Sequence, residues 1–196
     1  MTVSDSKKLF HEKFPYVIPG LYKRIVDEML VELNLLNHQN EFIQDDLFTV
    51  GLTETFKELT IGYKPEEHLQ LLFESLCNSS NFESSKIKDI SKKTLAKYSE
   101  KSLKEISILL KEKSNSKIYP SRLLNLGIYL IIARATDFKD KNESEKNQVI
   151  SEIIKDLNLP FNKVEKDISL YKSSIKKLDQ AKELLEEAKI QNKKKD

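Results

Sequence analysis

Residues 162–192 read NKVEKDISLYKSSIKKLDQAKELLEEAKIQN and contain neither Gly nor Pro. Large apolar or aromatic residues recur along this stretch at alternating spacings of four and three. They are Val164, Ile168, Tyr171, Ile175, Leu178 and Leu185, with Lys182 at the position between the last two. This is the heptad pattern of a helix that buries one seam, here over about three repeats. At 1.5 Å per residue such a helix is roughly 40 Å long, so we expect it to extend past a compact body.

This heptad seam has three possible uses: it can pack back on the body, self-associate, or bind a partner helix. Lys182 at a core position disfavours a simple dimeric coiled coil, so a monomer is preferred while the oligomeric state stays open. Ala181, Leu184 and Ala188 form a second stripe beside the seam. The basic tail, Lys193 to Lys195, has fewer lysines than the clusters that bind anionic membranes, and we expect it to be a solvated end.

The rest of the chain also favours helices, because 4 Gly and 5 Pro are too few for the tight turns of a sheet protein. Apolar residues at helical spacing predict a helix over Gly20–Gln39 and another whose face is Phe48, Leu52, Phe56 and Leu59. The remaining expected features are a cap at Asp45 and Asp46, a stop at Gly62, a helix beginning at Pro65, a loop over Asn78–Ser85, a weaker helix over Ile87–Tyr98, capping boxes at Ser102–Glu105 and Asn142–Glu145, and an apolar helix over Leu123–Ala135 that Pro120 opens. The predicted fold is all-α, with a single helical domain over residues 1–159 and a long coiled-coil-like helix with a basic tail over 160–196.

Two glycines, Gly51 and Gly127, fall inside predicted helices, where each costs about 1 kcal/mol relative to Ala. Either two helices approach closely at these positions or the helices are broken there. We favour close packing, because the apolar faces continue through both positions.

Composition excludes several classes of function. The formal net charge is +2 and the only arginines are Arg24, Arg122 and Arg134, which argues against nucleic-acid binding. The longest apolar run, Leu126–Ala133, is far shorter than the roughly 20 residues of a membrane span. Residues 1–10 lack the apolar run of a secretory signal and the arginines of a transit peptide. The single cysteine, Cys77, fits a reducing compartment.

No residue pattern predicts catalysis or metal binding. His11, His38, His68 and Cys77 lack the spacing of metal ligands, so we interpret the histidines as scattered surface or boundary residues and Cys77 as a buried, inert thiol. The sequence also lacks a glycine-rich phosphate loop. We therefore expect no enzyme and no cofactor, with no catalytic, cofactor-binding or metal residues. Arg134 has two interpretations: recognition of a partner, or the favoured one, bonding to the last carbonyls of its helix.

A set of short motifs, in order along nearly the whole chain, resembles the thylakoid formation protein family of photosystem II biogenesis proteins. The motifs are Ile18-Pro19-Gly20-Leu21-Tyr22, Phe48-Thr49-Val50-Gly51-Leu52, Gly62-Tyr63, Tyr119-Pro120-Ser121-Arg122, Leu126-Gly127, Val164-Glu165-Lys166-Asp167-Ile168 and Gln180-Ala181-Lys182-Glu183-Leu184-Leu185. Each motif is weak alone, but their shared order and spacing make the resemblance fairly specific.

The resemblance implies a non-catalytic, chaperone-like role in photosystem II biogenesis or repair and in thylakoid membrane organisation. It also implies protein partners: a thylakoid FtsH-type protease, for which the chain would be an adaptor or stabiliser, and photosystem II subunits or assembly intermediates. The missing transit peptide points to a cyanobacterial type, placed in the cytoplasm and peripherally at the cytoplasmic face of the thylakoid membrane. The alternative is a structural module that self-associates through its C-terminal helix.

Overall fold

The computed structural model describes residues 2–115 and 118–193, and within these ranges it contains nine α-helices, one 3-10 turn and no strand. The elements are α1 (Val3–Lys13), α2 (Gly20–Asn37), α3 (Asp46–Leu59), α4 (His68–Asn78), α5 (Ser84–Tyr98), α6 (Leu103–Lys111), η1 (Glu112–Asn115), α7 (Arg122–Ile132), α8 (Glu143–Asp156) and α9 (Phe161–Lys193). The predicted all-α class with a long C-terminal helix is confirmed. Among the described residues, no helix combines the length and the apolar character that crossing a bilayer requires.

Helix α3 lies at the centre of the body and packs most extensively against α7 and α5. The predicted face of α3 is buried, but so are all residues from Leu47 to Phe56, because α3 takes part in two apolar clusters. One joins α3 to α1, α2 and α4, and the other joins it to α6, α7, α8 and α9. A helix buried on all sides is a core helix rather than an amphipathic surface helix.

The backbones of α3 and α7 approach each other closely where the two helices cross. A Cβ atom built on Gly51 would lie 1.7 Å from the carbonyl oxygen of Leu123, and one built on Gly127 would lie 2.0 Å from the carbonyl oxygen of Leu47. Neither glycine can carry a side chain unless the two helices separate. The predicted close approach is confirmed and both helices are continuous.

Local caps fix several helix starts where the sequence predicted them. The Asp45 carboxylate accepts a hydrogen bond of 2.7 Å from the Phe48 backbone N–H. Complete capping boxes occur at Ser102–Glu105 and at Asn142–Glu145. These caps satisfy backbone donors that no intrahelical carbonyl can reach.

Three details differ from the expectation. Helix α4 begins only at His68, so Pro65 belongs to the preceding turn and not to the first turn of the helix. Helix α7 ends at Ile132 rather than Ala135, and Ser121 rather than Pro120 caps its start. The sequence analysis also missed α1, which buries Phe10 against the body.

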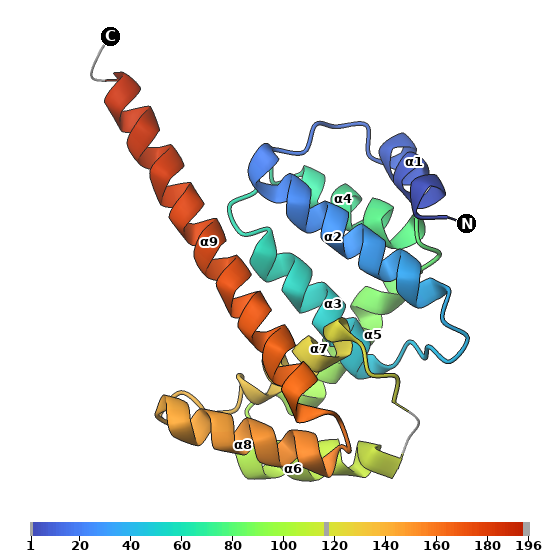
Figure 1. Cartoon of the computed structure of the whole chain (residues 1–196), viewed down its shortest axis with the longest axis vertical. Helices are drawn as coiled ribbons and strands as arrows, with labels where there is room; N and C mark the ends of the chain where they lie inside the picture. Colours follow the sequence, from blue (N-terminus) through green and yellow to red (C-terminus); the bar gives the residue numbers. More distant parts are fainter. Residues whose placement is uncertain (1, 116–117, 194–196) are drawn as a thin grey trace.

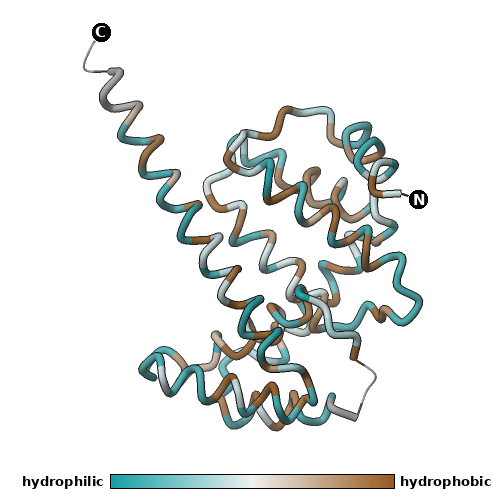
Figure 2. The backbone as a smooth tube through the Cα atoms, in the orientation of Figure 1, coloured by the Kyte–Doolittle hydropathy of each residue, from teal (hydrophilic) through white to brown (hydrophobic). Residues whose placement is uncertain are grey.

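The heptad seam divides along α9. Val164, Ile168, Tyr171 and Leu178 are buried against the body, whereas residues 183–188 are all exposed and the helix continues beyond the body (Figure 1). Figure 2 shows hydrophobic and hydrophilic residues alternating along the coloured part of the helix. Whether residues 1–159 form a domain by themselves stays a prediction. Of the predicted basic tail, residues 194–196 lie outside the described residues.

Candidate functional site

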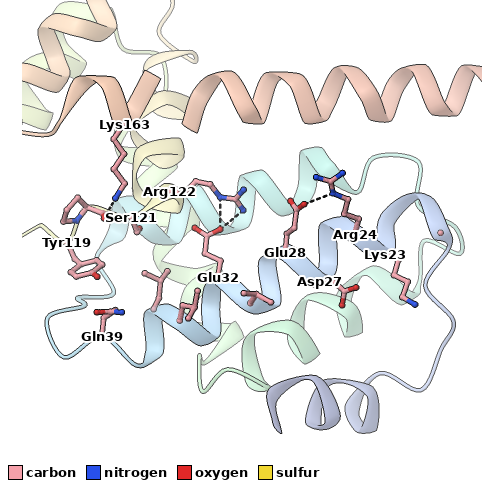
Figure 3. A pocket seen from close by; sticks show the side chains of 15 residues that line it. Lys23, Arg24, Asp27, Glu28, Glu32, Gln39, Tyr119, Ser121, Arg122 and Lys163 are labelled. Carbon is pink, nitrogen blue, oxygen red and sulfur yellow. Dashed lines mark hydrogen bonds and ion pairs between the residues drawn. The ribbon is translucent and has the colours of Figure 1, made fainter. Parts of the chain in front are cut away.

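A groove of about 850 Å³ follows one face of α2 and is bounded on its other side by the segment before α7 and the first turn of α9 (Figure 3). The Lys163 ammonium of α9 donates to the Pro120 carbonyl oxygen at 3.4 Å and so links these two segments. From α2 come residues spaced three or four apart, which places them on one face. They include Lys23, Arg24, Asp27, Glu28, Val31, Glu32 and Leu35.

An ion pair between Arg122 and Glu32 lies at the centre of this α2 groove (Figure 3). The Arg122 guanidinium donates from Nη2 at 2.6 Å and from Nε at 2.8 Å to the same oxygen of Glu32. Burial raises the pKa of the Glu32 carboxyl, and the neighbouring Asp167 raises it further, while Arg122 lowers it. Arg122 therefore compensates a region in which two carboxylates lie close together.

The α2 groove is better suited to binding a partner than to acid–base catalysis. Of its charged lining residues four are basic and three acidic, so its net charge is +1. The Glu32 carboxylate is held by Arg122, and Arg24 pairs with Glu28 at 2.8 Å. Leu35 is 53% exposed at the groove. Apolar contact rimmed by charges of both signs suits an extended or helical segment of a partner protein.

The projecting end of α9 carries a second candidate surface. Ala181, Leu184, Leu185 and Ala188, which we call the C-terminal stripe, lie one helical turn or less apart. Leu184 is 66% exposed and Leu185 is 52% exposed. Lys182, at the vacancy of the heptad seam, packs its stem over the turn at Gly62 and pairs with Asp179 at 3.2 Å. The body contact thus ends near Lys182, and the C-terminal stripe begins there.

The histidines predicted to be scattered surface or boundary residues lie on separate elements. His11 is exposed on α1, His38 caps the end of α2, and His68 opens α4. The His68 ring stacks on Tyr16 at 3.8 Å between centroids, and His38 Nδ1 lies 2.7 Å from the Asn34 carbonyl oxygen. In the part of the chain that the structure describes, no three His, Cys, Asp or Glu residues converge as a metal site would require.

Cys77 is fully buried, and burial raises the pKa of its thiol to about 12. Because the thiolate is the reactive form, we expect the folded chain to react with a small aromatic disulfide at least about a hundredfold more slowly than the unfolded chain. Release of the coloured thiolate, with and without denaturant, measures both rates. A fast reaction in the folded protein would mean that α4 opens readily and would contradict the buried, inert thiol.

Arg134 has the structural role that the sequence analysis favoured. Its guanidinium donates to the Leu130 carbonyl oxygen at 3.4 Å and forms an ion pair with Glu54 of α3. It therefore links the end of α7 to α3 rather than standing free for a partner.

Sequence reasoning missed the α2 groove and its central ion pair. The spacing of Asp27, Glu28 and Glu32 marks a polar face on α2, which is a local signal. Arg122, however, lies 90 residues further along the chain than Glu32, and the residues around Arg122 do not indicate that Glu32 is its partner.

Comparisons with known proteins agree with this architecture. A family model described as thylakoid formation protein matches residues 2–196. The chain is similar to Protein Thf1 of Prochlorococcus marinus subsp. pastoris (strain CCMP1986 / NIES-2087 / MED4), with 79% identity over 194 residues, 99% of this chain and 96% of that protein. It is 40% identical over 196 residues to Protein Thf1 of Synechococcus sp. (strain CC9605), covering 95% and 87% of the two chains. The solved structure of Psb29 superimposes with a TM-score of 0.88 at 27% identity and covers 100% of this chain and 98% of that one.

Proposed function

This chain belongs to the thylakoid formation protein family, and from that premise we propose that it is a non-catalytic factor in photosystem II biogenesis and repair and in thylakoid membrane organisation. We further propose that it acts as an adaptor or stabiliser of a thylakoid FtsH-type protease, with photosystem II subunits or assembly intermediates as further partners. Its place would be in the cytoplasm and peripherally at the cytoplasmic face of the thylakoid membrane.

The observation that supports an adaptor best is the C-terminal stripe. Leu184 and Leu185 are more than half exposed on the projecting helix end, and full burial of such a side chain by a partner contributes up to roughly 1.5–3 kcal/mol. Glu183, Glu186 and Glu187 flank the stripe and keep the free helix soluble. This pattern is typical of a helix that docks in the apolar groove of a partner protein.

The α2 groove is a second surface on which such an adaptor could hold a protein. Burial of two leucines would not by itself make a stable interface, because association costs several kcal/mol in lost translational and rotational freedom. A factor that joins a protease to its substrate also needs two separate contacts. The α2 groove reaches α9 only at Lys163, near the start of the helix, whereas the C-terminal stripe lies near its other end, so the two contacts would be separate.

Co-purification from cyanobacterial thylakoid extracts tests this function. The bait is the full chain, compared with a Leu184→Asp/Leu185→Asp variant and with a chain that stops after Lys182. A stop after Leu159 is a poor choice, because it would remove Val164, Ile168, Tyr171 and Leu178 from the core. We expect the full chain to recover the FtsH-type protease or photosystem II subunits and both stripe variants to lose most of this recovery, since a buried aspartate carries a large desolvation cost.

A Glu183→Gln/Glu187→Gln variant, which changes the same helix end but keeps both leucines, serves as the matched control and should bind as the full chain does. Equal recovery by the stripe variants would move recognition to the α2 groove. Recovery of no photosynthetic protein by any bait would overturn the proposed function.

The alternative of a self-associating module rests on one observation: Leu178 and Leu185 keep heptad spacing, and Leu185 is 52% exposed. Light scattering across a range of protein concentrations distinguishes the adaptor from the self-associating module. The adaptor proposal expects a constant monomer mass. A mass that rises with concentration and returns to that of a monomer in Leu184→Asp/Leu185→Asp would favour self-association.

A further inference from the structure

A second cavity, of about 620 Å³, lies between α3, α4 and α5 and is independent of the two surfaces above. Its walls are largely apolar and include Phe56, Tyr63, Leu69, Phe73 and Leu95. This volume and lining fall within the range of pockets that hold small organic ligands. We call it the α3–α5 pocket.

The charges around the α3–α5 pocket favour an anion. Its lining holds three lysines, Lys57, Lys88 and Lys92, against one acid, Glu66, which already pairs with Lys64 outside the pocket. Lys57 pairs with Glu54, and Lys88 lies 3.6 Å from Glu74. Lys92 is exposed on α5 and forms none of the ion pairs found among the described residues. A carboxylate at Lys92 and Lys88 would therefore meet cations with spare hydrogen-bond donors.

One buried hydroxyl also lines the α3–α5 pocket without a partner. Tyr63 is fully buried, and its hydroxyl oxygen makes no hydrogen bond to any described residue. The other lining hydroxyls have partners: those of Thr53 and Ser91 bond to each other at 2.5 Å, and that of Thr60 donates to the Phe56 carbonyl oxygen at 2.7 Å. Because the Tyr63 oxygen is inaccessible to solvent, a ligand's carboxylate would be held by the lysines rather than by this hydroxyl.

The chemistry of the pocket walls favours a hydrocarbon chain over a peptide as the ligand. The walls come mainly from helices, whose backbone N–H and C=O groups bond within the helix, so they provide no ladder for the backbone of a peptide. A peptide in this pocket would bury its own polar groups at a cost, whereas a hydrocarbon chain has no such groups. Phe56, Leu69 and Phe73 offer the contact that a hydrocarbon chain requires.

We propose that the α3–α5 pocket binds a free long-chain fatty acid, with its hydrocarbon chain against Phe56, Leu69 and Phe73 and its carboxylate at Lys88 and Lys92. The site does not depend on the proposed function, because it shares no lining residue with the α2 groove or the C-terminal stripe.

Displacement of a fluorescent fatty acid, dansylaminoundecanoic acid, from the full chain by palmitic acid tests the proposal below the micellar concentration of either. We expect saturable binding and displacement by palmitic acid, with methyl palmitate about tenfold weaker, because the ester carries no charge. Lys92→Glu should weaken binding by about tenfold or more. Lys93→Glu is the matched control, since Lys93 is also exposed on α5 but does not line the pocket, and this variant should bind as the unmodified chain does.

A Leu69→Trp variant, which fills the pocket, should abolish binding while circular dichroism reports an unchanged helix content. No saturable binding of the probe, or equal losses for Lys92→Glu and Lys93→Glu, would overturn the proposal. So would binding to phosphatidylglycerol vesicles but not to monomeric palmitic acid, which would indicate recognition of a lipid headgroup at a surface.

Discussion

Replacing Gly51 by alanine is expected to lower the free energy of unfolding by about 3 kcal/mol, at the upper end of the cost of overpacking a core. The added methyl group would lie 1.7 Å from the carbonyl oxygen of Leu123. That oxygen belongs to backbone, which cannot rotate away as a flexible side chain can, so α3 and α7 must move apart. Alanine would otherwise favour the helix by about 1 kcal/mol, and the expected loss of stability is net of this gain. Chemical denaturation followed by circular dichroism measures it.

Gly20→Ala is the matched control, because a Cβ on Gly20 meets nothing within 4 Å. It should be neutral or stabilising by up to about 1 kcal/mol. Gly127→Ala should resemble Gly51→Ala, and the double variant should lose less than the sum of the two, since one separation of the helices admits both methyl groups. A neutral result for Gly51→Ala would mean that the two helices do not cross with backbone contact.

Replacing Arg122 by methionine is expected to cost about 3 kcal/mol of stability, near the lower end for breaking a buried ion pair. The lower end applies because the Arg122 side chain is one third exposed. Methionine keeps most of the aliphatic volume but leaves the Glu32 carboxylate close to Asp167 without compensation. The Asp167 carboxylate in turn accepts a hydrogen bond of 2.7 Å from Asn125, which joins α9 to α7. The variant therefore weakens the junction of α2, α7 and α9, and the midpoint of chemical denaturation measures the loss.

The loss of stability caused by Arg122→Met should depend on pH. Burial already raises the pKa of Glu32, and loss of the guanidinium raises it further. A carboxyl whose pKa is higher in the folded than in the unfolded state favours folding at low pH, and this contribution is lost as pH rises through the folded pKa. The stability difference from the unmodified chain should thus be larger at about pH 8 than at about pH 5.

Two further variants keep this test specific to the buried pair. Arg24→Met, which breaks the exposed pair with Glu28 on the same helix, should cost less than about 0.5 kcal/mol. Arg122→Met/Glu32→Gln should recover part of the loss at about pH 8, because the Glu32 charge and its repulsion of Asp167 are then removed. A deficit that is the same at both pH values would assign the effect to packing.

Local chemistry explains which features of the fold could be predicted. The caps at Asp45, Ser102 and Asn142 depend on residues within three positions of one another, and so they can be found in the sequence. The same logic would have found α1, because Thr2 and Asp5 form a capping box. Pro65 was misplaced because its neighbours fit a first helical turn equally well, and only the folded chain shows its place in the turn before α4.

The sequence by itself determined that the chain is helical and that its last helix is long, and it favoured continuous helices through Gly51 and Gly127, because periodicity and the scarcity of helix breakers are properties of neighbouring residues. The tertiary structure alone decided that these two glycines face each other's helices and that Arg122 meets Glu32. It also decided that α3, α4, α5 and the segment between α3 and α4 line the α3–α5 pocket, and that the heptad seam leaves the body near Lys182. Each of these depends on where separate helices cross, which is set by the packing of residues far apart in the chain, and no local pattern encodes that geometry.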